Sequence, residues 1–486
     1  MSKSKNAVVP VSKSNDHLGE LPDGWVMAKG SDLFEWSSGK NLPKKKQREG
    51  DIPVFGGNGI AGYHDEALFD EPTIVVGRVG AHCGNVHSTN GPAWITDNAI
   101  YATQVLQEIS IKYVRMAMGR LNLRQVAQGN AQPFVNQRTL NEATIPLAPR
   151  GEQKRIVSKI EELFSDLDAG VSALERARAN LRRYRASVLK SAVEGRLTET
   201  WRKANKANPD IEPASELLAR ILRDRRQRWE QQQLATYESK GKKPPKNWQS
   251  KYKEPAAPDT TQIPELVEDG FSSEIWLSID TVIETLEQGW SPKCERVPSP
   301  SHDEWGVIKT SAVMPMEYIE VENKRLPDAL EPRPHLEVNQ NDLLITRAGP
   351  RKRAAVACLV RSTRPRLIVC DKVYRITFSS EFVLPEYMEI VLNAPSIMDV
   401  MDEMKTGISD SGVNLTQNRF RELMIPLPFI EEQKAIVEEV SRLFSVVENT
   451  DECLSKRIEH SGTLRQSILK SAFEGKLVEN REAALV

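Results

Sequence analysis

One segment of this 486-residue chain occurs twice, 280 residues apart. Residues 145–199 align with residues 425–479 without a gap, and 22 of the 55 aligned positions are identical. Both copies join a short Ile-Pro-Leu stretch to a long polar segment of helical character. A repeat at this distance predicts two equivalent modules, each with a globular part and a helical part. Two such modules on one chain suggest a pseudo-twofold molecule that meets a twofold-like partner.

Length and composition fit a chain of two or three domains that bury their own cores. Charged residues make up 27% and hydrophobic residues 39%. No apolar run reaches about eighteen residues, so no membrane span is expected, and the start of the chain lacks a secretory signal. The 5 cysteines form no close pair. That spacing argues against a zinc ribbon or a disulfide framework and favours a reducing, cytoplasmic location.

Basic residues gather in two places, although the formal net charge is only −1. From Arg347 to Arg366 there are seven basic residues and no acidic one, and a second cluster lies between Lys40 and Arg48. Such patches on a neutral protein can contact phosphate groups. A solvated face remains the simpler interpretation of either cluster taken alone.

Patterning divides the chain into alternating globular and helical parts. Residues 73–77 and 99–103 are β-branched or aromatic runs between turn residues, as expected of strands. After residue 150 the apolar positions follow a helical stripe. The expected organisation is a disordered N-terminus (1–20), a first strand-rich domain (21–149), a helical region (150–199), a basic insertion (200–260), a second strand-rich domain (261–428) and a second helical region (429–480).

The first helical region is expected to hold two helices separated by a break at Gly170. The second of them, residues 171–193, carries a seven-residue repeat that is typical of a coiled-coil seam. Its mate in the second copy is interrupted by Ser461 and Gly462. We therefore expect the two helical regions to pack antiparallel on each other, with an ordinary helical hairpin as the alternative. The expected seam positions are Leu174, Leu181 and Val188 and, three residues after each, Ala177, Tyr184 and Ser191.

Residues 200–260 have the composition of an insertion. A polar helix is expected from Ser215 to about Gln233, followed by a stretch rich in lysine and proline. Between Glu216 and Lys253 there are eleven basic and four acidic residues. We interpret the segment as a linker or peripheral arm, and an arm that contacts nucleic acid is the alternative.

The two strand-rich domains share a frame but few other residues. Residues 76–80 resemble residues 345–349, and residues 136–140 stand 280 positions before residues 416–420. The helical regions agree closely, so they should face equivalent surroundings. The globular parts differ, so they should bind different things with the same geometry. A protein that reads two unlike half-sites would have this pattern.

One formal match to a catalytic motif is present. Residues 57–62 fit the glycine-rich dinucleotide fingerprint, but Pro72 leaves little room for the helix that the motif requires. A turn between strands is the simpler interpretation, and a loop whose bare backbone approaches DNA is a third. His82, Cys83 and His87 lack a second cluster at metal-ligand spacing, so a polar loop is favoured there. No phosphate-binding loop, methyltransferase motif or nuclease cluster is found, and the chain is interpreted as non-catalytic.

Loop residues with basic or amide side chains are the candidates for contacting DNA. Arg78 and Arg347 occupy matching strand-end positions, each near a glycine. Polar residues also crowd the loops before residues 140 and 420, where they could instead cap the helix that follows. The predicted DNA-binding residues are Lys44, Lys45, Lys46, Asn58, Arg78, Gln128, Asn130, Gln132, Asn136, Gln137, Arg347, Arg351, Lys352, Arg353, Lys372, Ser409, Ser411, Asn414, Thr416 and Gln417.

The doubled helical motif resembles that of the DNA-specificity subunits of type I restriction-modification systems. Residues 21–25 and 77–80 look like the same family, and the resemblance covers about residues 21–200 and 261–480. Residues 148–151 depart from the Pro-Pro-Leu stretch usual in the family. The motif residues common to both copies include Ile145, Pro146, Leu147, Glu152, Gln153, Lys154, Leu163, Phe164, Leu189, Lys190, Ser191, Ala192, Glu194, Gly195 and Leu197.

The resemblance implies a mixed α/β (α+β) fold with two target-recognition domains separated by an antiparallel coiled-coil pair of long helices. Each recognition domain would read one half of a bipartite, asymmetric site in double-stranded DNA. The helical regions would dock two methylation subunits, which use S-adenosylmethionine, and restriction subunits that use ATP and Mg would join them. This chain would bind no cofactor or membrane. The residues expected to dock partners are Glu152, Gln153, Lys154, Glu432, Gln433 and Lys434.

Helix length suggests how the half-sites would be spaced. A helix of residues 171–193 would be about 35 Å long at 1.5 Å per residue, close to one turn of B-DNA. Two rival functions stay open. A methyltransferase or nuclease fused to a recognition module would need a catalytic motif that the sequence lacks. A coiled-coil adaptor with two ligand domains would bind partners without the steep salt dependence of DNA binding.

Overall fold

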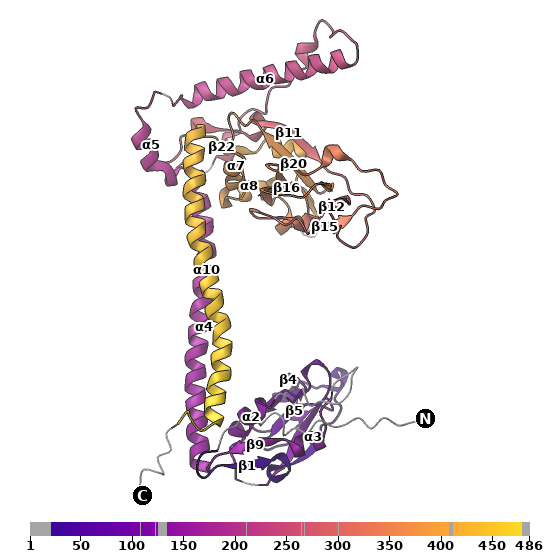
Figure 1. Ribbon diagram of the computed structural model, residues 1–486, viewed down its shortest axis with the longest axis vertical. Helices are drawn as coiled ribbons and strands as arrows, with labels where there is room; N and C mark the ends of the chain where they lie inside the picture. Colours follow the sequence, from indigo (N-terminus) through magenta and orange to yellow (C-terminus); the bar gives the residue numbers. More distant parts are fainter. Residues whose placement is uncertain are drawn as a thin grey trace. The chain divides into compact units, whose positions relative to one another are not determined.

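The chain forms two compact units in the computed structural model (Figure 1). The structure describes residues 21–478 except 107, 122, 125–133, 210, 264, 267, 300 and 408–411. Unit 1 comprises the described residues up to 177 and from 453 on, and unit 2 comprises residues 178–452. Each unit combines one strand-rich domain with one end of each of two long helices, α4 (Arg150–Val193) and α10 (Ile430–Phe473). The helices thus belong to both units, which differs from the six-part division expected from patterning.

Unit 1 contains a four-stranded antiparallel sheet in the order β2-β8-β5-β6 and a three-stranded sheet in the order β4-β3-β7. In a further antiparallel pair, β1 bonds to β9, the strand that immediately precedes α4 in the chain. The elements are β1 (Val26–Lys29), α1 (Gly30–Leu33), β2 (Phe34–Ser38), β3 (Ile52–Gly56), β4 (Gly59–His64), β5 (Ile74–Gly77), β6 (Val86–Ser88), β7 (Trp94–Ile95), β8 (Ala99–Val105), α2 (Ile111–Gly119), α3 (Gln137–Glu142) and β9 (Thr144–Leu147), with 3-10 turns at Lys44–Lys46 and Gly80–His82.

Unit 2 repeats these sheets strand for strand. Its four-stranded sheet has the order β11-β20-β16-β18, its three-stranded sheet the order β15-β12-β19, and β10 pairs with β22 before α10. In both units the middle strand of the three-stranded sheet pairs antiparallel with one neighbour and parallel with the other. The elements are β10 (Trp276–Ser278), β11 (Ile283–Gln288), β12 (Gly306–Ile308), β13 (Val313–Met314), β14 (Glu317–Tyr318), β15 (Asn323–Arg325), β16 (Leu343–Thr346), β17 (Ala348–Gly349), β18 (Ala357–Leu359), β19 (Leu367–Ile368), β20 (Val373–Phe378), α7 (Pro385–Leu392), α8 (Pro395–Met404), β21 (Val413–Asn414), α9 (Gln417–Arg421) and β22 (Met424–Pro426).

The mixed helix-and-strand fold with an internal repeat is therefore confirmed. The strands expected at residues 73–77 and 99–103 are confirmed as β5 and β8. All four residues of β5 are buried, because this strand lies inside the four-stranded sheet. The long helices complete each core. Ile160 and Phe473 contribute to the core of unit 1, and Val188 and Ile436 contribute to that of unit 2.

The break predicted at Gly170 is wrong, because α4 runs without interruption through this residue. A glycine inside a helix costs only about 1 kcal/mol relative to alanine, which packing along a 44-residue helix can offset. α10 also runs continuously through Ser461 and Gly462, so these residues interrupt the apolar repeat but not the helix.

The antiparallel packing of the long helices is confirmed within each unit. In unit 2, Arg178 of α4 makes two hydrogen bonds to Asp451 of α10, at 2.8 and 3.0 Å, and Arg185 lies over the ring of Phe444. The seam register is partly wrong, since Tyr184 is 46% exposed while its neighbour Arg185 faces the other helix. Long arginine side chains can pack their stems at a helix interface and pair their charged ends.

The insertion is folded and belongs to unit 2, which fits the interpretation as a peripheral arm rather than a linker. Its main helix, α6 (Ala214–Ser239), confirms the helix expected from residue 215. Leu217 and Ile221 of α6 are buried in the core of unit 2. A short helix α5 (Glu199–Asn205) precedes α6, and a 3-10 turn (Trp248–Lys251) follows it. In Figure 1, α6 lies beside β11.

Candidate nucleic-acid interface

Arg78 and Arg347 hold equivalent positions at the ends of β5 and β16. The backbone N–H of Arg78 donates to the carbonyl of Asn98, and that of Arg347 donates to the carbonyl of Lys372. The carbonyl of Arg78 accepts from Val135, just before α3, and the carbonyl of Arg347 accepts from Leu415, just before α9. Each arginine is therefore held by backbone bonds on both sides. The predicted equivalence of the two strand ends is confirmed in the backbone.

The side chain of Arg347 is held in place by its own domain. Its Nε donates to the carbonyl of Asp371 at 2.6 Å, its Nη1 donates to Asn414 Oδ1 at 2.8 Å, and its guanidinium lies 5.7 Å from the ring of Tyr374. A guanidinium fixed in this way is preorganised to meet an acceptor such as a guanine edge or a phosphate. Asn414 is thus a support for Arg347 rather than an independent contact.

Arg78 has different neighbours, since the tip of the β3–β4 hairpin packs against its strand. A Cβ on Gly77 would lie 2.5 Å from the carbonyl oxygen of Gly57, so the two backbones meet directly. Asn58 at the tip is exposed and accepts a hydrogen bond of 3.2 Å from Asn85. The glycine-rich segment is therefore a hairpin turn. The dinucleotide interpretation is wrong, because β4 follows the turn where the motif requires a helix.

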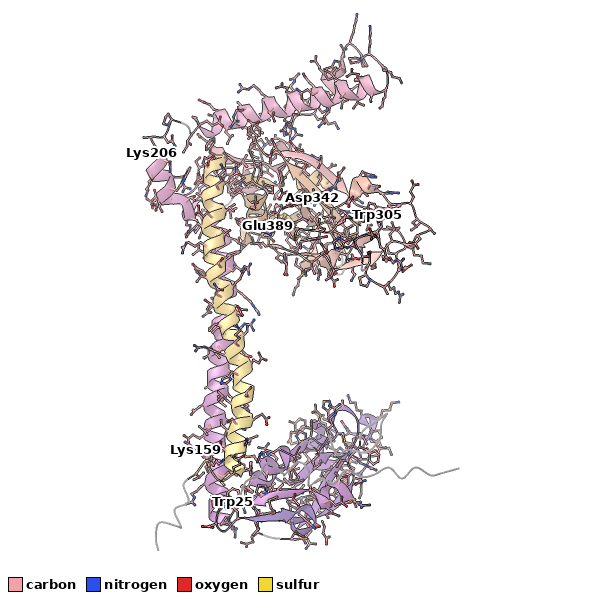
Figure 2. The ribbon with its side chains drawn as sticks, in the orientation of Figure 1. Trp25, Lys159, Lys206, Trp305, Asp342 and Glu389 are labelled. Carbon is pink, nitrogen blue, oxygen red and sulfur yellow. The ribbon has the colours of Figure 1, made fainter. Side chains whose placement is uncertain are left out.

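The basic run after Arg347 separates into two groups. Arg361 and Arg364 serve the fold: Arg361 pairs with the fully buried Glu389, labelled in Figure 2, and Arg364 is 7% exposed and donates to backbone carbonyls. Lys352 within the run and Lys372 just beyond it are exposed, and no side-chain partner is found for either within the described residues. Of the four residues, these two lysines suit contact with phosphate.

The other basic residues predicted to contact DNA differ in whether their side chains already have partners within the protein. Arg351 pairs with Asp402 at 2.7 Å, and Arg353 donates to the carbonyl of Thr310 at 3.2 Å. In unit 1 the 3-10 turn Lys44–Lys46 is exposed along its length. The lysines of this turn remain candidates for phosphate contact, whereas Arg351 and Arg353 are already partly engaged.

Two predicted contact residues cap helices instead. Asn136 Oδ1 accepts from the backbone N–H of Thr139 at 2.9 Å, and Thr416 accepts from that of Arg419 at 3.4 Å. These are N-caps of α3 and α9, which was the alternative role open to these loop residues. Gln137 and Gln417 begin the same helices. Gln128, Asn130, Gln132, Ser409 and Ser411 lie outside the described residues.

The glutamines predicted to dock partners are internal clamps. Gln153 accepts from the backbone N–H of Ser110 at 2.9 Å and donates to the carbonyl of Ala148 at 2.8 Å. Gln433 makes the equivalent bonds to Leu384 and Pro428. Both are nearly fully buried, at 2% and 0% exposed. Their repetition therefore reflects a shared joint between the long helix and the domain that precedes it.

The glutamates beside the clamps are also internal. Glu152 accepts from the indole N–H of Trp25 at 3.1 Å, and Glu432 accepts from Thr198 and Arg202, each at 2.6 Å. Their exposures are 4% and 6%. The docking prediction is therefore wrong for these four buried side chains, and it stays a prediction for the exposed Lys154 and Lys434.

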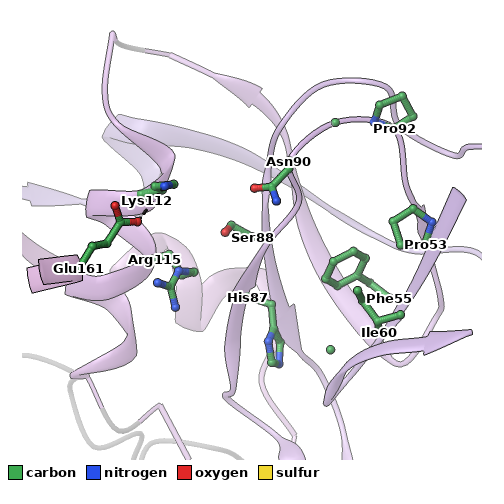
Figure 3. Close-up of a pocket in the computed structure, with 12 residues that line it drawn as sticks. Pro53, Phe55, Ile60, His87, Ser88, Asn90, Pro92, Lys112, Arg115 and Glu161 are labelled. Atoms are coloured by element: carbon green, nitrogen blue, oxygen red, sulfur yellow. Dashed lines mark hydrogen bonds and ion pairs between the residues drawn. The ribbon is translucent and has the colours of Figure 1, made fainter. Parts of the chain in front are cut away.

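A hollow of about 630 Å³ lies on unit 1 beside the β3–β4 hairpin. Figure 3 shows Phe55 and Ile60 on one side and Lys112, Arg115 and Glu161 on the other. Lys112 pairs with Glu161 at 2.7 Å. Lys112 and Arg115 are absent from the residues predicted from the sequence, although their spacing of three places both on one face of α2.

The stability of unit 1 should change with pH partly because of His87, which lines this hollow. Burial lowers the pKa of His87, and the charge of Arg115 lowers it further. The folded state therefore favours neutral His87. Its contribution to stability is full above the ordinary histidine pKa of about 6.5 and is lost as the pH falls through the pKa of His87 in the folded state. We expect His87→Gln to lose less stability than the wild type between about pH 7 and pH 5, measured by thermal unfolding. Equal losses would contradict this.

Two further properties of the described residues bear on function. No three His, Cys, Asp or Glu side chains among them come together as a metal site, and Cys83 is 1% exposed in the core of unit 1. Every helix in the same part of the chain is too short or too polar to span a bilayer.

Comparison with known proteins finds similarity to type I restriction specificity subunits. Residues 22–176 match the model of the type I restriction modification DNA specificity domain. The type I restriction enzyme EcoEI specificity subunit of Escherichia coli is 32% identical over 297 residues, which cover 60% of this chain and 43% of that protein. The EcoBI specificity subunit of Escherichia coli is 23% identical over 347 residues, covering 71% of this chain and 60% of that protein. The chain thus spans about half the length of these relatives.

Solved structures give the same fold. A chain from a structure of type I R-M system assembly and conformational transition superposes with a TM-score of 0.59 over 94% of this chain and 100% of its own length. The two sequences are 13% identical, so this likeness concerns the fold alone.

Proposed function

We propose that this chain is a specificity subunit of a type I restriction-modification system and selects the DNA site of that system, because residues 22–176 match the DNA specificity domain and the EcoEI specificity subunit is 32% identical over 60% of this chain. Each strand-rich domain reads one half of a bipartite, asymmetric site in double-stranded DNA. The observation that carries the proposal is the pair of matched strand ends at Arg78 and Arg347, which share backbone bonding but have different neighbours. Equal frames with unlike side chains suit two unlike half-sites.

The chain itself performs no chemistry in this proposal. The sequence lacks the catalytic motifs of methyltransferases and nucleases, and the glycine-rich segment is a hairpin turn. S-adenosylmethionine, ATP and Mg²⁺ are bound by the partner subunits, and this chain supplies the address. We place the complex in the cytoplasm.

Two methylation subunits and the restriction subunits are the proposed protein partners. The Glu-Gln pairs are buried, so docking uses the exposed faces of α4 and α10 instead, where Lys154 and Lys434 lie. Because the two copies of this joint are equivalent, each can receive one copy of the same partner.

A methylation map tests the function. The full-length chain is co-expressed with its cognate methylation subunit in a host without other DNA methylation, and modified bases are detected by sequencing. We expect a split, asymmetric adenine motif that disappears when this chain is omitted. An assembled complex that leaves no chain-dependent motif would contradict the proposal.

Salt dependence separates DNA reading from an adaptor function. Binding of the chain to its DNA site should weaken by about tenfold or more between 50 and 200 mM salt, because each neutralised phosphate releases counterions. An adaptor would show partner binding without DNA binding. The measurement is a fluorescence-anisotropy titration at several salt concentrations, with a scrambled duplex as the control.

A further inference from the structure

The insertion that precedes the second strand-rich domain is a built arm with two kinds of basic residue. Three of the five arginines of α6 attach the arm to unit 2, while Arg226 pairs with Glu230 of the same helix and Arg223 is exposed. Arg220 pairs with Glu381 at 2.6 Å, Arg225 contacts Asp280, and Arg228 pairs with Glu284. Together with the buried Leu217 and Ile221, these ion pairs fix α6 to the domain. Arg220, Arg225 and Arg228 are therefore occupied in holding the arm.

Six of the arm's lysines are not used in this way. These six lie beyond the last turn of α6, between residues 240 and 253, in a stretch without any acidic residue. Each is exposed, and within the described part of the chain no ion pair or side-chain hydrogen bond is found for any of them. They are Lys240, Lys242, Lys243, Lys246, Lys251 and Lys253.

An aromatic cluster holds this lysine segment against α6. Trp248 stacks on Trp229 with ring centroids 5.7 Å apart and an interplanar angle of 20°, and Tyr252 packs edge-on against Trp229 at 5.4 Å. Aromatic packing of this kind is worth about 1 kcal/mol beyond the area that it buries. The chain thus returns along the helix, and Lys251 and Lys253 are placed beside it.

A hollow of about 430 Å³ opens between the returning segment and the sheet. Five basic side chains line it and Glu284 is its one acidic lining residue among the described residues. Arg225, Arg228 and Arg421 are paired with Asp280 or Glu284, so the unpaired charge comes from Lys251 and Lys253, beside the rings of Trp229 and Tyr252. Such a site suits an extended anion. The basic lining residues are Arg225, Arg228, Lys251, Lys253 and Arg421.

We propose that this arm, residues 199–258, binds the phosphate backbone of duplex DNA that flanks the specific site. The proposal rests on the function proposed above. Lysine is a flexible point charge and contacts phosphate without reading bases, whereas arginine is the residue that reads guanine bidentately. Since the exposed and unpaired cations of the arm are mostly lysines, the arm adds affinity and leaves the recognised sequence unchanged.

The test compares two duplexes bound by the full-length chain in complex with its methylation subunit. The short duplex holds the mapped site alone, and the long one extends it by about 20 base pairs, roughly two helical turns, on each side. We expect the wild type to favour the long duplex by about tenfold at low salt. Changing Lys242, Lys243, Lys246 and Lys251 to Gln should remove that preference and lower the salt slope by about one unit per lysine in contact.

The matched control changes the same four lysines to Arg, which keeps the charge and should keep the preference. Equal binding of both duplexes by the wild type would overturn the arm proposal while leaving site recognition intact. Binding of neither duplex would overturn both. If the Gln variant instead lost its methylation subunits with the duplex preference unchanged, the surface would be a protein-docking site and the proposal would be wrong.

Discussion

Gln433→Leu is expected to destabilise unit 2 by about 3 kcal/mol or more, a large loss for a single side chain. Gln433 is fully buried, and its amide bonds three backbone groups, the N–H of Leu384 and the carbonyls of Phe382 and Pro428, at 2.8 to 2.9 Å. Leucine has a similar volume but leaves all three polar groups buried without partners. Each unsatisfied group costs about 1–3 kcal/mol.

Hydrogen–deuterium exchange of the amides of α7 is the suitable measurement, because a chain with two units need not unfold in one step. The matched control is Lys434→Leu, at the next position. Lys434 is exposed, and within the described part of the chain its side chain bonds Glu431 of its own helix and no other residue, so its loss should change stability by about 0.5 kcal/mol at most. Exchange at α7 that is equal in the two variants would show that the clamp contributes nothing.

Gln153→Leu should produce the same loss in unit 1. Gln153 joins Ser110, the N-cap of α2, to Ala148 before α4. Because the bonds lie inside unit 1, the faster exchange should appear at α2 and leave α7 unchanged. Each substitution thus reports on its own unit.

The repeat itself was predictable because two long segments with many identical residues can be aligned directly, without any inference from local secondary-structure patterns. The strands β5 and β8 and the start of α4 were predictable for a different reason, since buried strands and amphipathic helices leave a period in the sequence. The equivalence of Arg78 and Arg347 followed from a short alignment of strand ends. In these cases the signal is local or is a direct repetition.

The residues whose exposure was predicted wrongly have hydrogen-bond partners that are distant in the sequence. Glu152 and Gln153 are polar residues on a helix, which usually means exposure. They are buried because Trp25, Ser110 and Ala148 supply their hydrogen bonds, and local spacing carries no trace of these contacts. The register of the seam failed for the same reason.

Arg78→Ala and Arg347→Ala are expected to relax opposite halves of the DNA site. An arginine that reads a base pair contributes about 1–3 kcal/mol of discrimination, or about 10- to 100-fold. Arg78 belongs to unit 1 and Arg347 to unit 2, so each variant should lose discrimination at one half-site and keep it at the other. The measurement is the affinity of each variant for duplexes with base changes confined to one half.

Two controls separate base reading from charge and from folding. Lys159→Ala removes a partly exposed cation on α4 whose ion-pair partner among the described residues is Glu162 and should leave both half-sites unchanged. Arg347→Lys keeps the charge but loses the fork that bonds Asp371 and Asn414, so it should retain salt-dependent affinity and lose discrimination. If both alanine variants relaxed the same half, the two domains would not read separate halves, and the bipartite model would fail at its central step.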